Sequence, residues 1–232
     1  MEDEEELVNL KELIKSSFVF VIYMNSYYFR YIPIIILNIF NVYQNDQSNT
    51  LLCALIANII LCLVLIKLYW KELKDELRLF IKNIYEFLDT GIKYWGLGLL
   101  IMVTSNLILT YLFKSEGANN ELLLRELIKP YPIIMGLNIC LIGPFIEEIV
   151  FRKSFKNAFP NPFIFVSLSF LVFGSLHVTS YATNLIDYLY IIPYGTLGGV
   201  FAYMYLKTNS IFTSMTFHMI HNTLLFSLIL IM

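Results

Sequence analysis

Long apolar segments are the feature of this sequence that most restricts its fold. Blocks of about 20 residues with few charges recur from Phe18 to the end of the chain, and a helix of about 20 apolar residues crosses the hydrocarbon core of a bilayer. Composition agrees, because 58% of the 232 residues are hydrophobic and 15% are charged, whereas about a quarter of a soluble domain is charged. The sequence therefore predicts an all-α, polytopic membrane helix bundle.

About seven transmembrane helices are predicted, after an interfacial N-terminal helix over residues 7–15 whose apolar residues recur at helical spacing. The predicted spans are 18–42, 51–70, 91–113, 133–158, 163–177, 185–206 and 211 to the end. Arg30 interrupts the first span, and we expect it to snorkel or to face another part of the protein. The mixed charges of 71–89 predict a solvated helix, and 114–129 a polar connection with a short helix.

The distribution of Lys and Arg predicts the orientation in a cell membrane. With a cytoplasmic N-terminus, twelve of the sixteen cationic residues fall on the inner side and three on the outer side, with Arg30 unassigned. The C-terminus is then outside. No basic face of the kind that binds phosphate backbones occurs, which argues against a nucleic-acid partner. The acidic start at 1–6 lacks the basic region of a cleavable signal peptide.

Ionisable side chains lie inside three of the apolar segments, where they are costly and indicate a specific use. The adjacent Glu147 and Glu148 lie in the fourth span, and His177 ends the fifth. The seventh span contains the run from His218 to Asn222. Gly143 and Pro144, just before the glutamates, would loosen that helix, which is tolerated where the freed backbone lines a cavity.

Helical spacing predicts which of these groups can meet. Glu148 and Arg152 are i and i+4 and can form an ion pair, whereas Glu147 is rotated by about 100° and is free to face something else. Glu147 and His177 lie about 16 and 22 Å from the turn at 159–162, level to within roughly one helical turn. On the seventh span, His218 and Asn222 share one face. These four residues are expected to line one polar cavity.

The chemistry that such a set supports is amide hydrolysis. A carboxylate and an imidazole can take a proton from water, while a second imidazole and an amide donate to the developing oxyanion. Metal ligation is the competing role, with Glu147, His177 and His218 holding an ion such as zinc. Because a His-Glu-x-x-His helix is absent and an amide is a poor zinc ligand, direct water activation without a cofactor is preferred.

Three motifs in this order resemble the CPBP family, which comprises the type II CAAX prenyl endopeptidases and their prokaryotic, Abi-type relatives. The motifs are Glu147-Glu148-x-x-x-Arg152, Phe173-x-x-x-His177 and His218-x-x-x-Asn222. The resemblance covers about 137–225, so the single domain 1–232 divides into a CPBP-like core at 131–225 and unmatched N-terminal helices at 1–130. It implies base roles for Glu147 and His177, oxyanion roles for His218 and Asn222, and supporting roles for Glu148 and Arg152.

The resemblance implies an intramembrane endopeptidase that cuts a membrane-associated or lipidated peptide, with the lipid bilayer as its surroundings. Eukaryotic members cut prenylated C-terminal tripeptides, and prokaryotic relatives are linked to bacteriocin immunity, pheromone maturation and control of membrane sensors. The composition, rich in Ile, Asn and Lys, hints at a bacterial source. A non-catalytic immunity or sensor-binding protein stays open as an alternative. A transporter is disfavoured, because the buried polar groups lie in one half of the chain.

Overall fold

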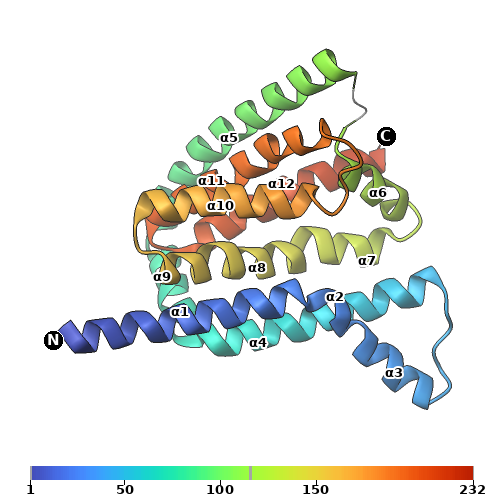
Figure 1. Cartoon of the computed structure of the whole chain (residues 1–232), viewed down its shortest axis with the longest axis horizontal. Helices are drawn as coiled ribbons and strands as arrows, with labels where there is room; N and C mark the ends of the chain where they lie inside the picture. The colour runs from blue at the N-terminus through green and yellow to red at the C-terminus, as the bar shows by residue number, and fades with distance from the viewer. Residues whose placement is uncertain (1, 115–116, 232) are drawn as a thin grey trace.

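The computed structural model describes residues 2–114 and 117–231, and it confirms the helical class, with no strand among these residues (Figure 1). The helices, in chain order, are α1 Glu2–Met24, α2 Ser26–Phe29, α3 Tyr31–Ile39, α4 Gln47–Lys82, α5 Ile84–Phe113, α6 Asn119–Ile128, α7 Pro132–Leu137, the π-helix η1 Asn138–Ile142, α8 Gly143–Glu148, the π-helix η2 Ile149–Ser154, α9 Phe155–Ala158, α10 Pro162–Val178, the 3₁₀-helix η3 Asp187–Tyr190, α11 Ile191–Thr208 and α12 Ile211–Ile231. The side chains of 1–9, which carry the predicted acidic start and the first part of the predicted interfacial face, lie outside the described part of the chain. So do residues 115–116 of the predicted polar connection.

The described helices contain fewer membrane spans than the seven predicted. Five are long and apolar enough to cross a membrane, or six if the bent pair formed by α1 with α2 and α3 is one span. The difference lies in α10, which has 17 residues. At about 1.5 Å per residue it measures about 26 Å, which is less than the roughly 30 Å of a hydrocarbon core.

The predicted interfacial helix is not a separate element. It continues into the predicted first span as α1, and the chain then bends by 58° between Met24 and Ser26. The break falls where the sequence has Asn25, and Arg30 follows it. The Arg30 guanidinium lies 3.7 Å from the ring centroid of Tyr27 and also bonds to the Tyr27 hydroxyl, so its charge is stabilised by a neighbouring ring.

The charged segment 71–89 has a solvated face, as predicted, with Lys74, Asp75 and Arg78 exposed, but its other face makes contacts that the prediction did not include. Its first part extends α4, whose 36 residues contain one non-helical residue, Tyr69, and its last part opens α5. Glu76 accepts hydrogen bonds from Lys153 at 2.6 Å and from the Ile211 backbone N–H at 2.7 Å. Glu72 binds Lys153 at 3.1 Å. These carboxylates therefore join α4 to η2 and α12 instead of facing water.

The helix formed by residues 132–158 occupies the middle of the bundle. In Figure 1 the α1 and α4 helices lie on one side of it, and α10, α11 and α12 lie on the other, with α5 beyond them. Its buried residues, among them Ile149, Val150 and Phe151, pack in one apolar cluster with Leu65 of α4 and Phe165 of α10. The two termini lie at opposite ends of the bundle (Figure 1).

Glycines allow α10 and α11 to approach closely. A Cβ on Gly174 would lie 2.7 Å from the carbonyl oxygen of Ile191, and one on Gly195 would lie 2.9 Å from that of Phe170. Gly195 therefore allows close packing of α11 against α10. Because Gly174 is three residues before His177, this contact also sets the position of the histidine.

We expect Gly174→Ala to lower the free energy of unfolding by about 1–3 kcal/mol, because the added methyl group meets backbone that cannot rotate away. Thermal unfolding of the detergent-solubilised protein measures the effect. Gly96→Ala on α5 is the matched control, because a Cβ there meets nothing within 4 Å and alanine favours a helix over glycine. Equal midpoints for both variants would contradict the close contact between α10 and α11.

Candidate active site

The helix that carries the paired glutamates is loosened just before them. In η1 the N–H of Gly143 bonds to the carbonyl of Asn138, five residues back. The next carbonyl in this register, that of Ile139, would need an N–H at position 144, where proline has none. Asn222 of α12 donates its Nδ2 to this carbonyl at 2.9 Å. The loosening predicted at Gly143 and Pro144 therefore leaves the Ile139 carbonyl free to accept a hydrogen bond from the Asn222 amide and to hold it in place.

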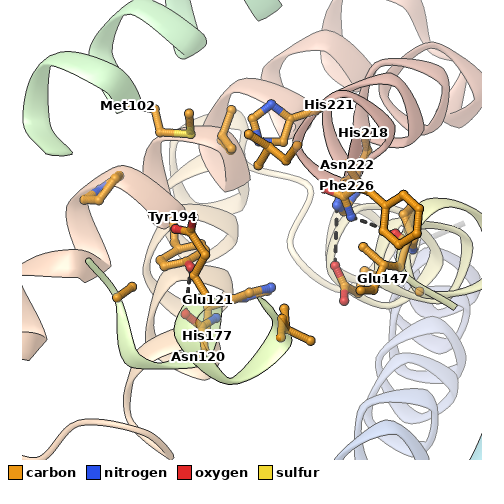
Figure 2. A pocket seen from close by; sticks show the side chains of 18 of the residues that line it. Met102, Asn120, Glu121, Glu147, His177, Tyr194, His218, His221, Asn222 and Phe226 are labelled. Atoms are coloured by element: carbon orange, nitrogen blue, oxygen red, sulfur yellow. Dashed lines mark hydrogen bonds and ion pairs between the residues drawn. The ribbon is translucent and has the colours of Figure 1, made fainter. Parts of the chain in front are cut away.

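His218 of α12 lies between the two glutamates. Its Nδ1 is 2.9 Å from Oε1 of Glu148. Its Nε2 is 3.6 Å from Oε2 of Glu147, a contact that is dashed in Figure 2. His218 and Glu148 are buried, whereas the Glu147 side chain keeps 19% of its surface exposed. Glu147 is therefore the carboxylate that a substrate or a water molecule can reach.

Glu148 also forms the predicted ion pair with Arg152, at 3.4 Å between Oε1 and Nη1. Both side chains are fully buried. The guanidinium lies over the ring of Phe173, 4.4 Å from its centroid, and near that of Phe201 at 5.6 Å. A desolvated cation over an aromatic face is stabilised by the ring quadrupole. These contacts hold a charge in the core that would otherwise be expensive.

His177 lies on the opposite wall, held by backbone and aromatic rings. Its Nδ1 is 2.8 Å from the carbonyl oxygen of Phe173, so Nδ1 carries the hydrogen and Nε2 is left as an acceptor. The imidazole stacks on Tyr194 of α11, with centroids 5.1 Å apart, and the Tyr194 hydroxyl donates to Asn120 of α6 at 2.7 Å. The plane of the imidazole is therefore fixed from two sides.

One cavity of about 410 Å³ joins these groups, and its lining includes Glu147, His177, His218 and Asn222. Figure 2 shows Glu147, His218 and Asn222 on one wall and His177 with Tyr194 and Asn120 on another. The side chains of Glu147 and His177, both within the described part of the chain, form no hydrogen bond with each other. The space between these two walls is where a peptide bond and a water molecule could lie.

Several site contacts are absent from the sequence prediction. The helical wheel assigned Glu148 to Arg152 alone, and it gave no sign that His218 bonds to the same carboxylate. Asn120 lies in the predicted polar connection, where asparagine is common and indicates no particular role. Its contact with Tyr194 arises because the fold brings α6 against α11. His221, the third histidine, also lines the cavity and is buried. It is a cavity residue that the predicted site did not include.

The donor set fits a metal ion poorly. Within residues 2–114 and 117–231, no three His, Cys, Asp or Glu side chains converge as ligands of one ion. His177 is directed to the Phe173 carbonyl on one wall, and Glu147 lies with His218 on the other. The competing prediction, with Glu147, His177 and His218 on zinc, would therefore need these walls to move together.

A helical membrane protein with a buried glutamate, histidine and asparagine site is the class that this geometry defines. Residues 129–224 match the family described as "Type II CAAX prenyl endopeptidase Rce1-like". A curated relative, "Putative membrane peptidase YdiL" of Bacillus subtilis (strain 168), is 29% identical over 111 residues, or 47% of this chain. Both matches show a likeness of this part of the chain to the CPBP family.

The likeness is partial in extent. The chain spans about two fifths of the length of this curated relative, with 41% covered. No solved structure matches the chain. The family match begins after α6, so it does not include Asn120.

Proposed function

We propose that this protein is an intramembrane endopeptidase that hydrolyses a peptide bond in a membrane-associated substrate. The observation that carries the proposal is the convergence of Glu147, His177, His218 and Asn222 on one cavity of about 410 Å³. This volume is in the range of ligand sites. The family match supports peptide hydrolysis as the reaction.

In the proposed reaction, a water molecule lies between Glu147 and the Nε2 of His177. The carboxylate takes a proton from the water, and the hydroxide oxygen forms a bond to the carbonyl carbon of the substrate. The carbonyl oxygen becomes an oxyanion. When this intermediate collapses, the C–N bond breaks and Glu147 returns its proton to the leaving amine. The products are one new carboxylate and one new amine.

His218 and Asn222 are the proposed donors to the oxyanion. Asn222 uses one amide hydrogen on the Ile139 carbonyl, which leaves its second hydrogen for the substrate. A His218 ring with hydrogen on both nitrogens donates Nδ1–H to Glu148 and can offer Nε2–H to the oxyanion. Donors fixed before the reaction stabilise the charge without reorganising, which is typically worth 10²–10³ in rate for each donor.

We further propose that the N-terminus is cytoplasmic and the C-terminus is outside. The opposite positions of the termini in Figure 1 support this, as does the excess of Lys and Arg on one side. Lys15, Lys153 and Lys156 lie in the inner group, and two of them bind Glu72 of α4.

The test is cleavage of membrane-anchored peptides by the protein reconstituted in lipid vesicles, in water enriched in ¹⁸O. We expect one product to carry ¹⁸O in its new carboxylate, and we expect cleavage to continue in a zinc chelator. Loss of cleavage with the chelator and recovery with zinc would instead move His177 and His218 to metal ligation. Vesicles without the protein are the control. No cleavage of any peptide by the folded protein would overturn the proposal.

A further inference from the structure

A second cavity reaches the same two candidate bases from the other side of α6. This cavity, which we call the α1-side cavity, measures about 490 Å³ and is lined by residues of α1, α6, α8 and α10, together with Tyr181. The cavity described above, of about 410 Å³, is called the core cavity and lies among α5, α6, α11 and α12. Glu147, His177, Asn120 and Leu124 line both cavities.

The α6 helix divides the two cavities. Asn120 and Leu124 are i and i+4, so they form one edge of the helix, and this edge is the part of α6 shared by both cavities. Glu121 and Ile128 lie on one flank of that edge, and they line only the core cavity. On the other flank, Leu123 and Leu127 line only the α1-side cavity. The shared edge of α6 therefore lies where the two cavities meet, beside Glu147 and His177.

The start of α6 is held in place on both sides. Asn119 donates to the backbone carbonyl of Tyr181 and to the Asp187 carboxylate, both at 3.0 Å. The next residue, Asn120, accepts from the Tyr194 hydroxyl at 2.7 Å. Two consecutive asparagines thus tie α6 to the segment after α10 and to α11. The helix is a fixed partition between two spaces that meet at the proposed bases.

Both cavities offer apolar walls to a peptide. The α1-side cavity presents Leu123, Leu127 and Leu176, and the core cavity presents Met102 and Leu197 together with further apolar residues of α12. Each volume lies in the range of a ligand site. Release of a short peptide from a chain terminus would need only one such space beside the scissile bond.

We propose that the substrate is cut at an internal bond, with apolar residues on one side of the bond bound in the core cavity and apolar residues on the other side bound in the α1-side cavity. This inference rests on the proposed function. It goes beyond that function because it specifies an internal bond with an apolar segment on each side. The partition formed by α6 then sets the bond that is cut.

The first arm of the test shortens a cleaved peptide. A peptide that the wild-type protein cuts is truncated by two apolar residues, on the N-terminal or on the C-terminal side of the bond. Because burial of apolar side chains contributes to binding, we expect each truncation to lower kcat/KM by at least about 10-fold. A side that can be removed without effect would overturn the two-sided site.

The second arm fills one cavity at a time. Leu123→Trp occupies the α1-side cavity and Met102→Trp the core cavity, and each should lower kcat/KM for the full peptide by about 10-fold. In the Leu123→Trp variant, truncation on one side of the bond should cause no further loss of kcat/KM. In the Met102→Trp variant, truncation on the other side should cause none. Leu107→Trp on α5 is the matched control, because Leu107 is 64% exposed. Loss of sensitivity on the same side in both variants would contradict the proposal.

The two proposals fail differently. If the folded wild-type protein cuts no peptide, the proposed function fails and the two-sided site fails with it. If peptides are cut but only one flank affects kcat/KM, hydrolysis stands and the two-sided site is wrong. The truncation arm uses only the wild-type protein, so it decides the question even where a tryptophan variant does not fold.

Discussion

Glu147→Gln is expected to lower kcat for peptide cleavage by about 10²–10⁴-fold, the usual contribution of a general base. Glutamine has nearly the same shape as glutamate and still offers an oxygen to water, but it cannot take a proton at neutral pH. The exposed part of the Glu147 side chain, 19%, faces the cavity, whereas Glu148 is fully buried. The change should therefore affect the reaction much more than the fold.

Single-turnover cleavage in lipid vesicles measures this effect, with peptide binding followed separately by fluorescence anisotropy. We expect the dissociation constant to change little, since the variant keeps the shape of the site. Glu86→Gln is the control, because Glu86 is an exposed carboxylate on α5. A Glu147→Gln variant that cuts at more than about a tenth of the wild-type rate would exclude Glu147 as the base that activates water.

Local spacing was enough to predict the groups that share the cavity. Glu147, His177, His218 and Asn222 all line it, because each lies on a helix whose rise and face are set by short-range geometry. The ion pair between Glu148 and Arg152 follows from the same rule and is present. The geometry gives the positions of these groups, and their roles in a reaction stay predictions.

The features that sequence reasoning missed depend on contacts between distant parts of the chain. Asn120 reaches Tyr194 over a separation of 74 residues, and no periodicity within α6 indicates this partner. Lys153 was assigned to the cytoplasmic side as an ordinary charge, yet it is buried against Glu76. The predicted number of spans is higher because 163–177 was counted as a crossing, whereas the 17 residues of α10 are fewer than a hydrocarbon core requires.

Arg152→Met is expected to lower the free energy of unfolding by about 3–5 kcal/mol, the usual cost of leaving one partner of a buried ion pair uncompensated. Arg152 and Glu148 are both fully buried, 3.4 Å apart. Without the guanidinium, the Glu148 carboxylate keeps His218 as its partner. Methionine fills a similar volume under Phe173 and Phe201, so the cost should come mainly from the charge and little from a cavity.

The double variant Arg152→Met with Glu148→Gln separates charge from packing. Replacing both members of a buried pair removes the uncompensated charge, so the double variant should regain about 2 kcal/mol or more relative to Arg152→Met alone. Unfolding in mixed micelles, with helix content as the probe, measures all four corners of the cycle. Additive losses would mean that the two charges do not stabilise each other. A coupling of the expected size would show that Arg152 and Glu148 stabilise each other within the bundle, where the Glu148 carboxylate positions the His218 ring.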